Sequence, residues 1–159
     1  MRRLSYRSSS FFAVMLLCGC GGLPVPSSDA LATRPAPSSP IPAGVYRGQM
    51  QCEMITDTPQ GRFRDVLMSP GILEFNKRGV LIVEGQEIAV GRTVTVGEFR
   101  GTYTRITPTA TGVIVDADLE SGFSIAEVSA RADGVDYSIQ VLQAQDSSTT
   151  TTSCNGFLQ

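Results

Sequence analysis

The sequence predicts an all-β fold, an antiparallel up-and-down meander of about eight to ten short strands. Three observations support this fold class. Apolar and polar residues alternate in several segments, turn motifs separate these segments at short intervals, and no window carries the apolar stripe of an amphipathic helix. Such a meander closes as a barrel or packs as a sandwich, and we expect the closed barrel rather than the sandwich.

The alternation is clearest in three segments. In the first, GVYRGQMQCEMIT at residues 44–56, the residues Tyr46, Met50, Cys52 and Met54 share one face. In the second, one face carries Val113, Val115, Ala117 and Leu119, and the other carries polar residues such as Asp116 and Asp118. In the third, one face carries Val135, Tyr137, Ile139 and Val141, and the other carries polar residues such as Asp136 and Gln140. A period of two residues is typical of a strand with one buried face.

Turn motifs punctuate the chain at residues 58–61, 69–71, 76–79, 84–85, 111–112, 121–122 and 133–134. All seven contain glycine, and two contain proline. Asp133-Gly134 is the strongest signal, because Asp-Gly suits the positive φ values of a two-residue hairpin turn. The motif Ser69-Pro70-Gly71 predicts a further turn between strands.

The chain divides into three regions. Residues 1–19 have the layout of a secretory signal peptide, with Arg2, Arg3 and Arg7 before an apolar stretch at residues 11–17. That stretch is shorter than the about 20 residues that a membrane-spanning helix needs. Residues 20–43 contain six of the nine prolines and predict a disordered Pro/Ser-rich tether. Residues 44–159 form the predicted β-barrel domain.

The motif Leu17-Cys18-Gly19-Cys20 resembles the lipobox of bacterial lipoproteins. The resemblance implies cleavage before Cys20 and lipidation of Cys20 with acyl chains such as palmitate, so that the mature protein is anchored to a membrane. Gly21 at the second mature position implies the outer membrane of a Gram-negative bacterium, facing the periplasm or the surface. The alternative is a plain secretory signal with incidental cysteines.

With Cys18 removed and Cys20 acylated, only Cys52 and Cys154 remain, in the first and last predicted strands. An exported protein meets an oxidising compartment, so we expect these two to form a disulfide. The bond would close a loop of about 100 residues, and first and last strands are neighbours in a closed meander. Two free thiols or a metal pair are the alternatives.

The segments GVYRGQMQC and SCNGFL, at the two ends of the domain, loosely resemble small secreted meander barrels. Lipocalins, avidins and barrel-type protease inhibitors share an opening Gly-x-aromatic-x-Gly strand and a closing strand with cysteine. Tyr46 stands where these families more often have tryptophan. The resemblance covers about fifteen residues and implies the fold alone, with no binding residue carried over.

Composition excludes several function classes. The chain has no histidine, which removes Ser-His-Asp and Cys-His catalysis and the commonest metal ligand, so we expect neither an enzyme nor a metal or cofactor site. Without Arg2, Arg3 and Arg7, ten basic residues face fifteen acidic ones, a net charge of −5 that argues against nucleic acid binding. Asp116, Asp118 and Glu120 resemble a calcium ladder, and Arg100 and Arg105 flank Tyr103, but we expect solvated strand faces in both cases.

The expected function is that of a membrane-tethered envelope lipoprotein of structural or protein-interaction type. Its partners would be the membrane, through the lipid anchor, and an envelope protein. Small residues such as Ala117, Ala126, Ala130 and Ala132 opposite large ones such as Tyr46, Met50 and Tyr137 favour a filled interior. The alternative is lipocalin-like binding of a small apolar ligand in the barrel.

Overall fold

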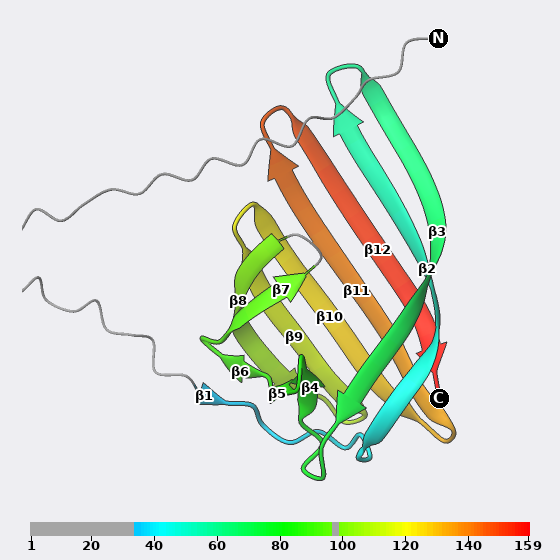
Figure 1. Ribbon diagram of the computed structural model, residues 1–159, viewed down its shortest axis with the longest axis vertical. Coiled ribbons are helices and arrows are strands. Elements are labelled where there is room, and N and C mark those ends of the chain that lie inside the picture. Colours follow the sequence, from blue (N-terminus) through cyan, green and yellow to red (C-terminus); the bar gives the residue numbers. More distant parts are fainter. Residues whose placement is uncertain (1–33, 97–98) are drawn as a thin grey trace, which may run out of the picture. The chain divides into compact units, whose positions relative to one another are not determined.

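The computed structural model describes residues 34–96 and 99–159, and this part of the chain is built from strands without a helix (Figure 1). The strands are β1 (Arg34–Pro35), β2 (Gly44–Thr58), β3 (Gly61–Phe75), β4 (Leu81–Val83), β5 (Gln86–Glu87), β6 (Ala89–Val90), β7 (Thr93–Val96), β8 (Phe99–Pro108), β9 (Gly112–Leu119), β10 (Gly122–Arg131), β11 (Gly134–Gln145) and β12 (Ser148–Leu158). Within the described ranges, therefore, no helix is long and apolar enough to cross a membrane.

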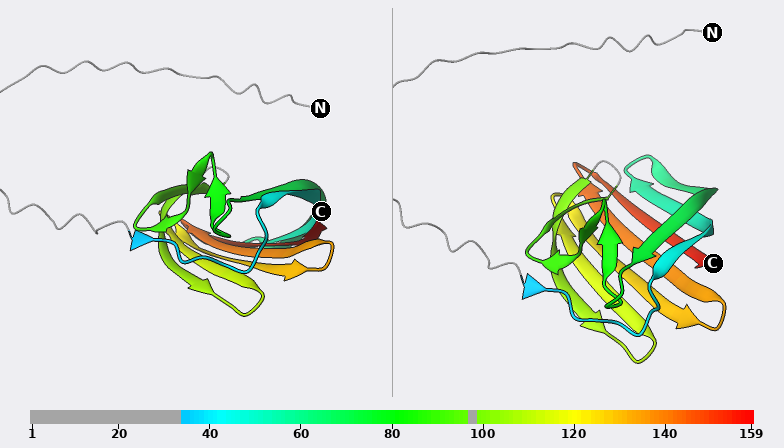
Figure 2. Two further views of the ribbon diagram at one scale, coloured as in Figure 1. Left: turned by 90° about the horizontal axis from the view of Figure 1, so that it is seen from below. Right: turned by 60° about the horizontal axis from the view of Figure 1, so that its bottom comes forward.

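Ten strands form one antiparallel sheet in the order β5-β4-β3-β2-β12-β11-β10-β9-β8-β7, and β1 pairs separately with β6. The sheet curls into a half-barrel (Figure 2). The predicted all-β, barrel-like meander is thus confirmed. As expected, the first and last long strands are neighbours, because β2 lies between β3 and β12.

The two edge strands of the sheet, β5 and β7, are joined by the connecting residues 88–92. No ladder joins β5 directly to β7 in the described residues. Instead, the Ile88 N–H donates to the Leu81 carbonyl, while the Gly91 N–H donates to the Tyr103 carbonyl and the Tyr103 N–H to the Arg92 carbonyl. This short bridge thereby links β4 to β8 on the opposite side of the half-barrel.

The concave face of the sheet carries the apolar residues that the alternation predicts. Cys52 lies opposite Cys154, which lies opposite Ile139 on β11, and the same face continues through Val115 on β9. The buried core includes Ile41, Phe75, Val80, Leu81, Ile88, Val128, Val135 and Leu158. The period of two therefore assigns the faces of β2, β9 and β11 correctly.

Close contacts on this face explain why two glycines stand opposite one another, Gly48 on β2 and Gly71 on β3. The side chain of Leu158, which is fully buried, lies over both of them. A Cβ on Gly48 would lie 2.5 Å from the Phe157 carbonyl oxygen, and one on Gly71 would lie 2.8 Å from Leu158 Cδ2. A larger residue at Gly48 would therefore displace the backbone of β12, whereas one at Gly71 would displace the side chains of Leu158 and Met50.

One predicted turn is wrong: residues 69–71 lie inside β3, which continues from Gly61 to Phe75. Pro70 lies opposite Gln49 of β2, while β4 pairs with β3 only at Glu74 and Phe75. Proline is tolerated in a strand whose other side is free, because the N–H that it lacks would have no partner there. Pro70 therefore indicates a free edge of the sheet and not a turn.

The hairpin between β10 and β11 also differs in detail from the prediction. Its loop residues are Ala132 and Asp133, and Gly134 pairs with Arg131. Neither Asp133 nor Gly134 has a positive φ. Gly134 is instead required by space, because a Cβ there would lie 2.2 Å from the Leu158 carbonyl oxygen. Ala132, predicted to face inward, is exposed at this turn.

Residues 34–43, predicted as part of the tether, pack against the folded domain. β1 pairs with β6, the Ser39 N–H and hydroxyl both donate to the Gly79 carbonyl, and Ile41 is only 2% exposed. The folded unit therefore begins about ten residues before Gly44. The remainder of the predicted tether, and the predicted signal peptide, lie outside the described residues.

Candidate functional site

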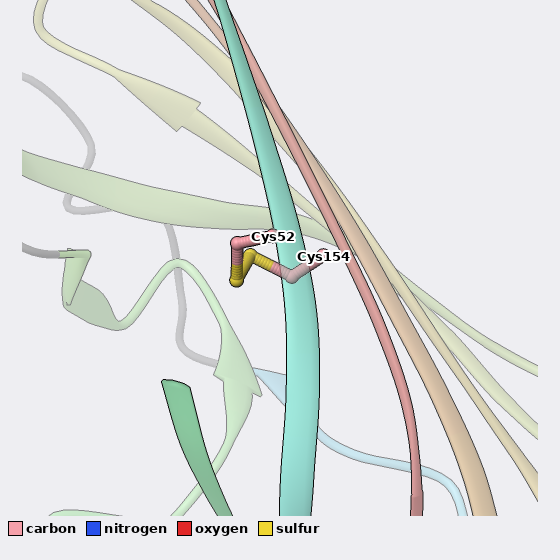
Figure 3. The surroundings of a disulfide bond; sticks show 2 residues. All are labelled: Cys52 and Cys154. Carbon is pink, nitrogen blue, oxygen red and sulfur yellow. A yellow bond between two sulfur atoms is a disulfide. The ribbon is translucent and has the colours of Figure 1, made fainter. Parts of the chain in front are cut away.

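The two cysteines of the domain are brought together on the concave face of the central strands (Figure 3). Their sulfur atoms lie 2.14 Å apart, at disulfide distance, and their Cα atoms lie 4.0 Å apart. Arg47 and Gln159 exchange both backbone hydrogen bonds. Hydrogen-bonded and non-hydrogen-bonded pairs alternate along antiparallel strands, and Cys52 lies an odd number of residues after Arg47. Cys52 and Cys154 therefore form a non-hydrogen-bonded pair. Such pairs have the shorter cross-strand spacing, which suits a bond between the side chains.

The clearest surface feature is the apolar hairpin, which we define as the hairpin of β2 and β3 from residue 52 to residue 69. Figure 1 shows it at the margin of the sheet. Phe63 and Leu67 on its concave face are 59% and 45% exposed, and Val66 and Met68 on its convex face are 49% and 62% exposed. Large apolar side chains are therefore exposed on both faces of one strand, which is typical of an interaction site.

The backbone of β3 is also free along its outer side. In the described part of the chain, residues 61–73 pair only with β2. The Val66 N–H donates over 2.9 Å to the carboxylate of its neighbour Asp65, which shields one position of the edge. An exposed edge of this length and apolar character favours the addition of another strand.

Ion pairs on the convex face hold the register of the apolar hairpin. Arg62 donates to both oxygens of Asp57 over 2.7 and 3.0 Å and lowers the pKa of that carboxyl below its ordinary value. Arg64 forms a second pair with Glu53. Both pairs are exposed, so each adds little to stability, but together they neutralise the charges beside the free edge.

A cavity of about 260 Å³ lies inside the half-barrel. Its lining is mostly apolar and comes from β3, β4 and β7 through β11, including Leu73, Leu81, Val94, Val115, Ala126 and Ile139. Tyr103 and Tyr137 add the main polar groups. The volume lies just below the range of about 300–1,000 Å³ that is usual for small-molecule sites.

The two cavity tyrosines titrate at unusually high pH. Burial, with the negative charge of Glu84 nearby, raises the pKa of Tyr103 to about 12, and burial raises the pKa of Tyr137 to about 12. Both phenols are consequently neutral at physiological pH and can donate hydrogen bonds.

The remaining residues considered from the sequence do not assemble into a site. Arg105 pairs with Asp116 across β8 and β9, and Asp118 is exposed on the convex face. Tyr103 is buried on the opposite face from Arg105, because a register shift lies between them. Within the described ranges, no group of three or more cysteine, aspartate and glutamate residues could hold a metal ion.

Cys20, the predicted lipidation site, lies outside the described residues. The apolar hairpin and the free edge of β3 were missed by sequence reasoning, although signals for both are present. RFRDVLMSPGI, residues 62–72, has apolar residues without strict alternation, and Pro70 marks the free side. Comparison with known proteins found no matching family model, no similar curated protein and no similar solved structure.

Proposed function

We propose that this protein is a lipid-anchored lipoprotein of the cell envelope, attached through Cys20, that binds a protein partner through its apolar hairpin. The observation that carries the proposal is the exposure of Phe63, Val66, Leu67 and Met68 on both faces of one strand. A soluble domain without a partner does not ordinarily leave such a strand in water.

Anchoring rests on the Leu17-Cys18-Gly19-Cys20 motif and on the signal-like segment before it. Several acyl chains on one cysteine give stable attachment, at about 0.8 kcal/mol for each buried CH₂ group. Gly21 favours the outer membrane. The folded domain would then be held near the membrane by residues 21–33, a shorter tether than the sequence predicts.

Metabolic palmitate labelling tests the anchor. The wild-type chain should be labelled and should fractionate with membranes, whereas Cys20→Ser should lose the label and accumulate unprocessed. Cys18→Ser should behave like wild type, because Leu17 is too large for the position before an acylated cysteine. Undiminished labelling of Cys20→Ser would contradict the anchor.

Site-specific photo-cross-linking tests the hairpin. A photoreactive residue in place of Phe63 or Met68 should give a cross-linked product of defined mass in intact cells. The same residue at Asp118, which is exposed on β9, is the matched control and should give none. Equal cross-linking from all three positions, or from none, would contradict a binding surface on the hairpin.

The cavity supports a second candidate function, the binding of a small apolar ligand. Its lining and the two neutral phenols suit an apolar molecule with one hydrogen-bonding group. Ala126→Phe should fill the cavity and abolish any ligand that co-purifies with the protein in mass spectrometry. Ile125→Phe, on the exposed face of the same strand, is the control. An empty cavity in the wild-type protein would exclude this function.

A further inference from the structure

We propose that the partner of the apolar hairpin is a second copy of this chain, and that the two copies join by antiparallel pairing of their β3 edges around a two-fold axis at Leu67. This inference rests on the proposed function, for which it names the partner. The pairing would extend each half-barrel sheet into the other without any rearrangement of the strands.

The backbone of β3 is oriented for this pairing. Gly61 closes the two-residue turn opposite Thr58, so the odd-numbered residues of β3 bond to β2. The backbone N–H and C=O groups of the even-numbered residues point away from β2. The hydrogen bond from the Val66 N–H to the Asp65 side chain shows this independently. Arg62, Arg64, Met68 and Ile72 therefore present their N–H and C=O groups at the free edge. Pro70, also even-numbered, presents only its carbonyl.

The free segment has a natural centre. Residues 61–73 are symmetrical about Leu67, so pairing around this residue uses the whole edge. Val66 of one copy then faces Met68 of the other, with the Val66 N–H transferred from the Asp65 carboxylate to the Met68 carbonyl, and Arg62 faces Ile72. Leu67 faces its own counterpart as a non-hydrogen-bonded pair, in which side chains approach most closely. Val66, Leu67 and Met68 thereby gain apolar cross-strand neighbours from the second copy.

Charges favour this register over its neighbours. Asp65 faces Ser69 of the second copy, and Arg64 faces Pro70, so no like charges stand opposite one another. A register centred on Asp65 would place the two Asp65 carboxylates directly opposite one another. A register centred on Ser69 would leave residues 61–64 unpaired. Because Arg62 and Arg64 are already neutralised by Asp57 and Glu53, two such edges do not repel each other strongly.

Cysteine cross-linking in membranes tests both the partner and the register. Two tagged full-length chains are co-expressed, one with Arg62→Cys and one with Ile72→Cys, on the convex face away from Cys52 and Cys154. In the proposed register these cysteines are directly opposite, at a Cα separation of about 5.5 Å. In a dimer of two Arg62→Cys chains, the two introduced cysteines lie ten residues apart along the paired strands, a distance of about 33 Å. A reducible dimer should therefore form only when both variants are present.

Met68 provides a matched pair of variants for the same experiment. Met68→Pro removes an outward N–H and no bond to β2, so it should abolish the cross-link while the domain stays folded. Met68→Thr also removes the apolar side chain but keeps the N–H, so it should retain the cross-link. Formation of the Cys52–Cys154 bond in each variant reports correct folding.

Three results would overturn the self-pairing. These are equal cross-linking by either variant alone, persistence of the dimer in Met68→Pro, and absence of any dimer from folded chains. A photo-cross-link from Met68 to a protein of another mass would overturn the second copy as the partner but leave the proposed function standing. The absence of every cross-link from the hairpin would remove both.

Discussion

Gly48 is a residue at which the packing of the central strands leaves no room for a side chain. Gly48→Ala places a Cβ 2.5 Å from a backbone carbonyl oxygen, which cannot rotate away. We expect it to lower the free energy of unfolding by about 1–3 kcal/mol, the usual cost of overpacking. Gly44→Ala, on the same strand with its nearest contact at 3.8 Å, should cost nothing or stabilise slightly. Chemical denaturation of the two variants makes the comparison, and equal effects would contradict this account.

At the scale of elements, the cysteine pair links β2 to β12, strands that are separated by 102 residues in sequence. In the chain-entropy model such a loop contributes up to about 4–5 kcal/mol. Cys52→Ser, Cys154→Ser and the double variant should therefore lower the melting temperature by the same amount.

The state of the two thiols is best measured in denaturant without reductant, because both side chains are buried in the folded protein. We expect no alkylation of Cys52 or Cys154 until a reductant is added. Two reactive thiols under these conditions would contradict the bond. A double variant less stable than either single variant would argue for a second role of one cysteine.

The segment before β2 is a second element with a measurable role. Ile41 is almost completely buried beside Phe75 and Val80, although it lies in a proline-rich stretch. Ile41→Ala should lower the free energy of unfolding by about 2–5 kcal/mol, as for other buried aliphatic residues. Val45→Ala, which truncates a side chain that is 46% exposed, should have a much smaller effect. Equal losses of unfolding free energy in Ile41→Ala and Val45→Ala would contradict the burial of Ile41 in the core.

For the molecule as a whole, the two cavity tyrosines predict how stability falls at high pH. The pKa of Tyr103 and of Tyr137 rises from 10.0 in the unfolded chain to about 12 in the folded protein. Their contribution is complete below pH 10 and is lost between pH 10 and 12, because the unfolded chain releases these protons first. Tyr137→Phe should make the denaturation midpoint less dependent on pH in this window. An unchanged pH dependence would indicate that Tyr137 is accessible to water.

Much of this architecture could be predicted from the sequence. The alternation on β2, β9 and β11 assigns the buried face because a one-residue shift would expose every apolar side chain. Pro70 misleads because a turn and a free edge both tolerate the missing N–H, and only the pairing of the neighbouring strands distinguishes them. Ile41 gives no signal, because its burial depends on β6 and on the turn at Gly79, which are distant in sequence.

Of the candidate sites, the sequence predicts the cysteine pair but neither the cavity nor the free edge of β3. Cys52 and Cys154 could be paired from the sequence because they are the two cysteines that follow the lipobox-like motif. The cavity could not be predicted, since its walls come from seven strands and its volume depends on how far the sheet curls. The free edge of β3 depends on β4 being only three residues long, a length that its apolar residues do not fix.

The position of β12 in the middle of the sheet has a consequence for how the protein is made. Its two ladders, to β2 and to β11, include pairs formed between the first and last thirds of the described chain. Contacts between such distant segments raise the contact order and slow folding. The centre of the sheet therefore stays incomplete until β12 has been synthesised and can pair with β2 and β11. Until β12 pairs, β2 and β11 each present a row of unpaired backbone groups that favours pairing with another chain, so the same strand that completes the sheet also protects it from aggregation.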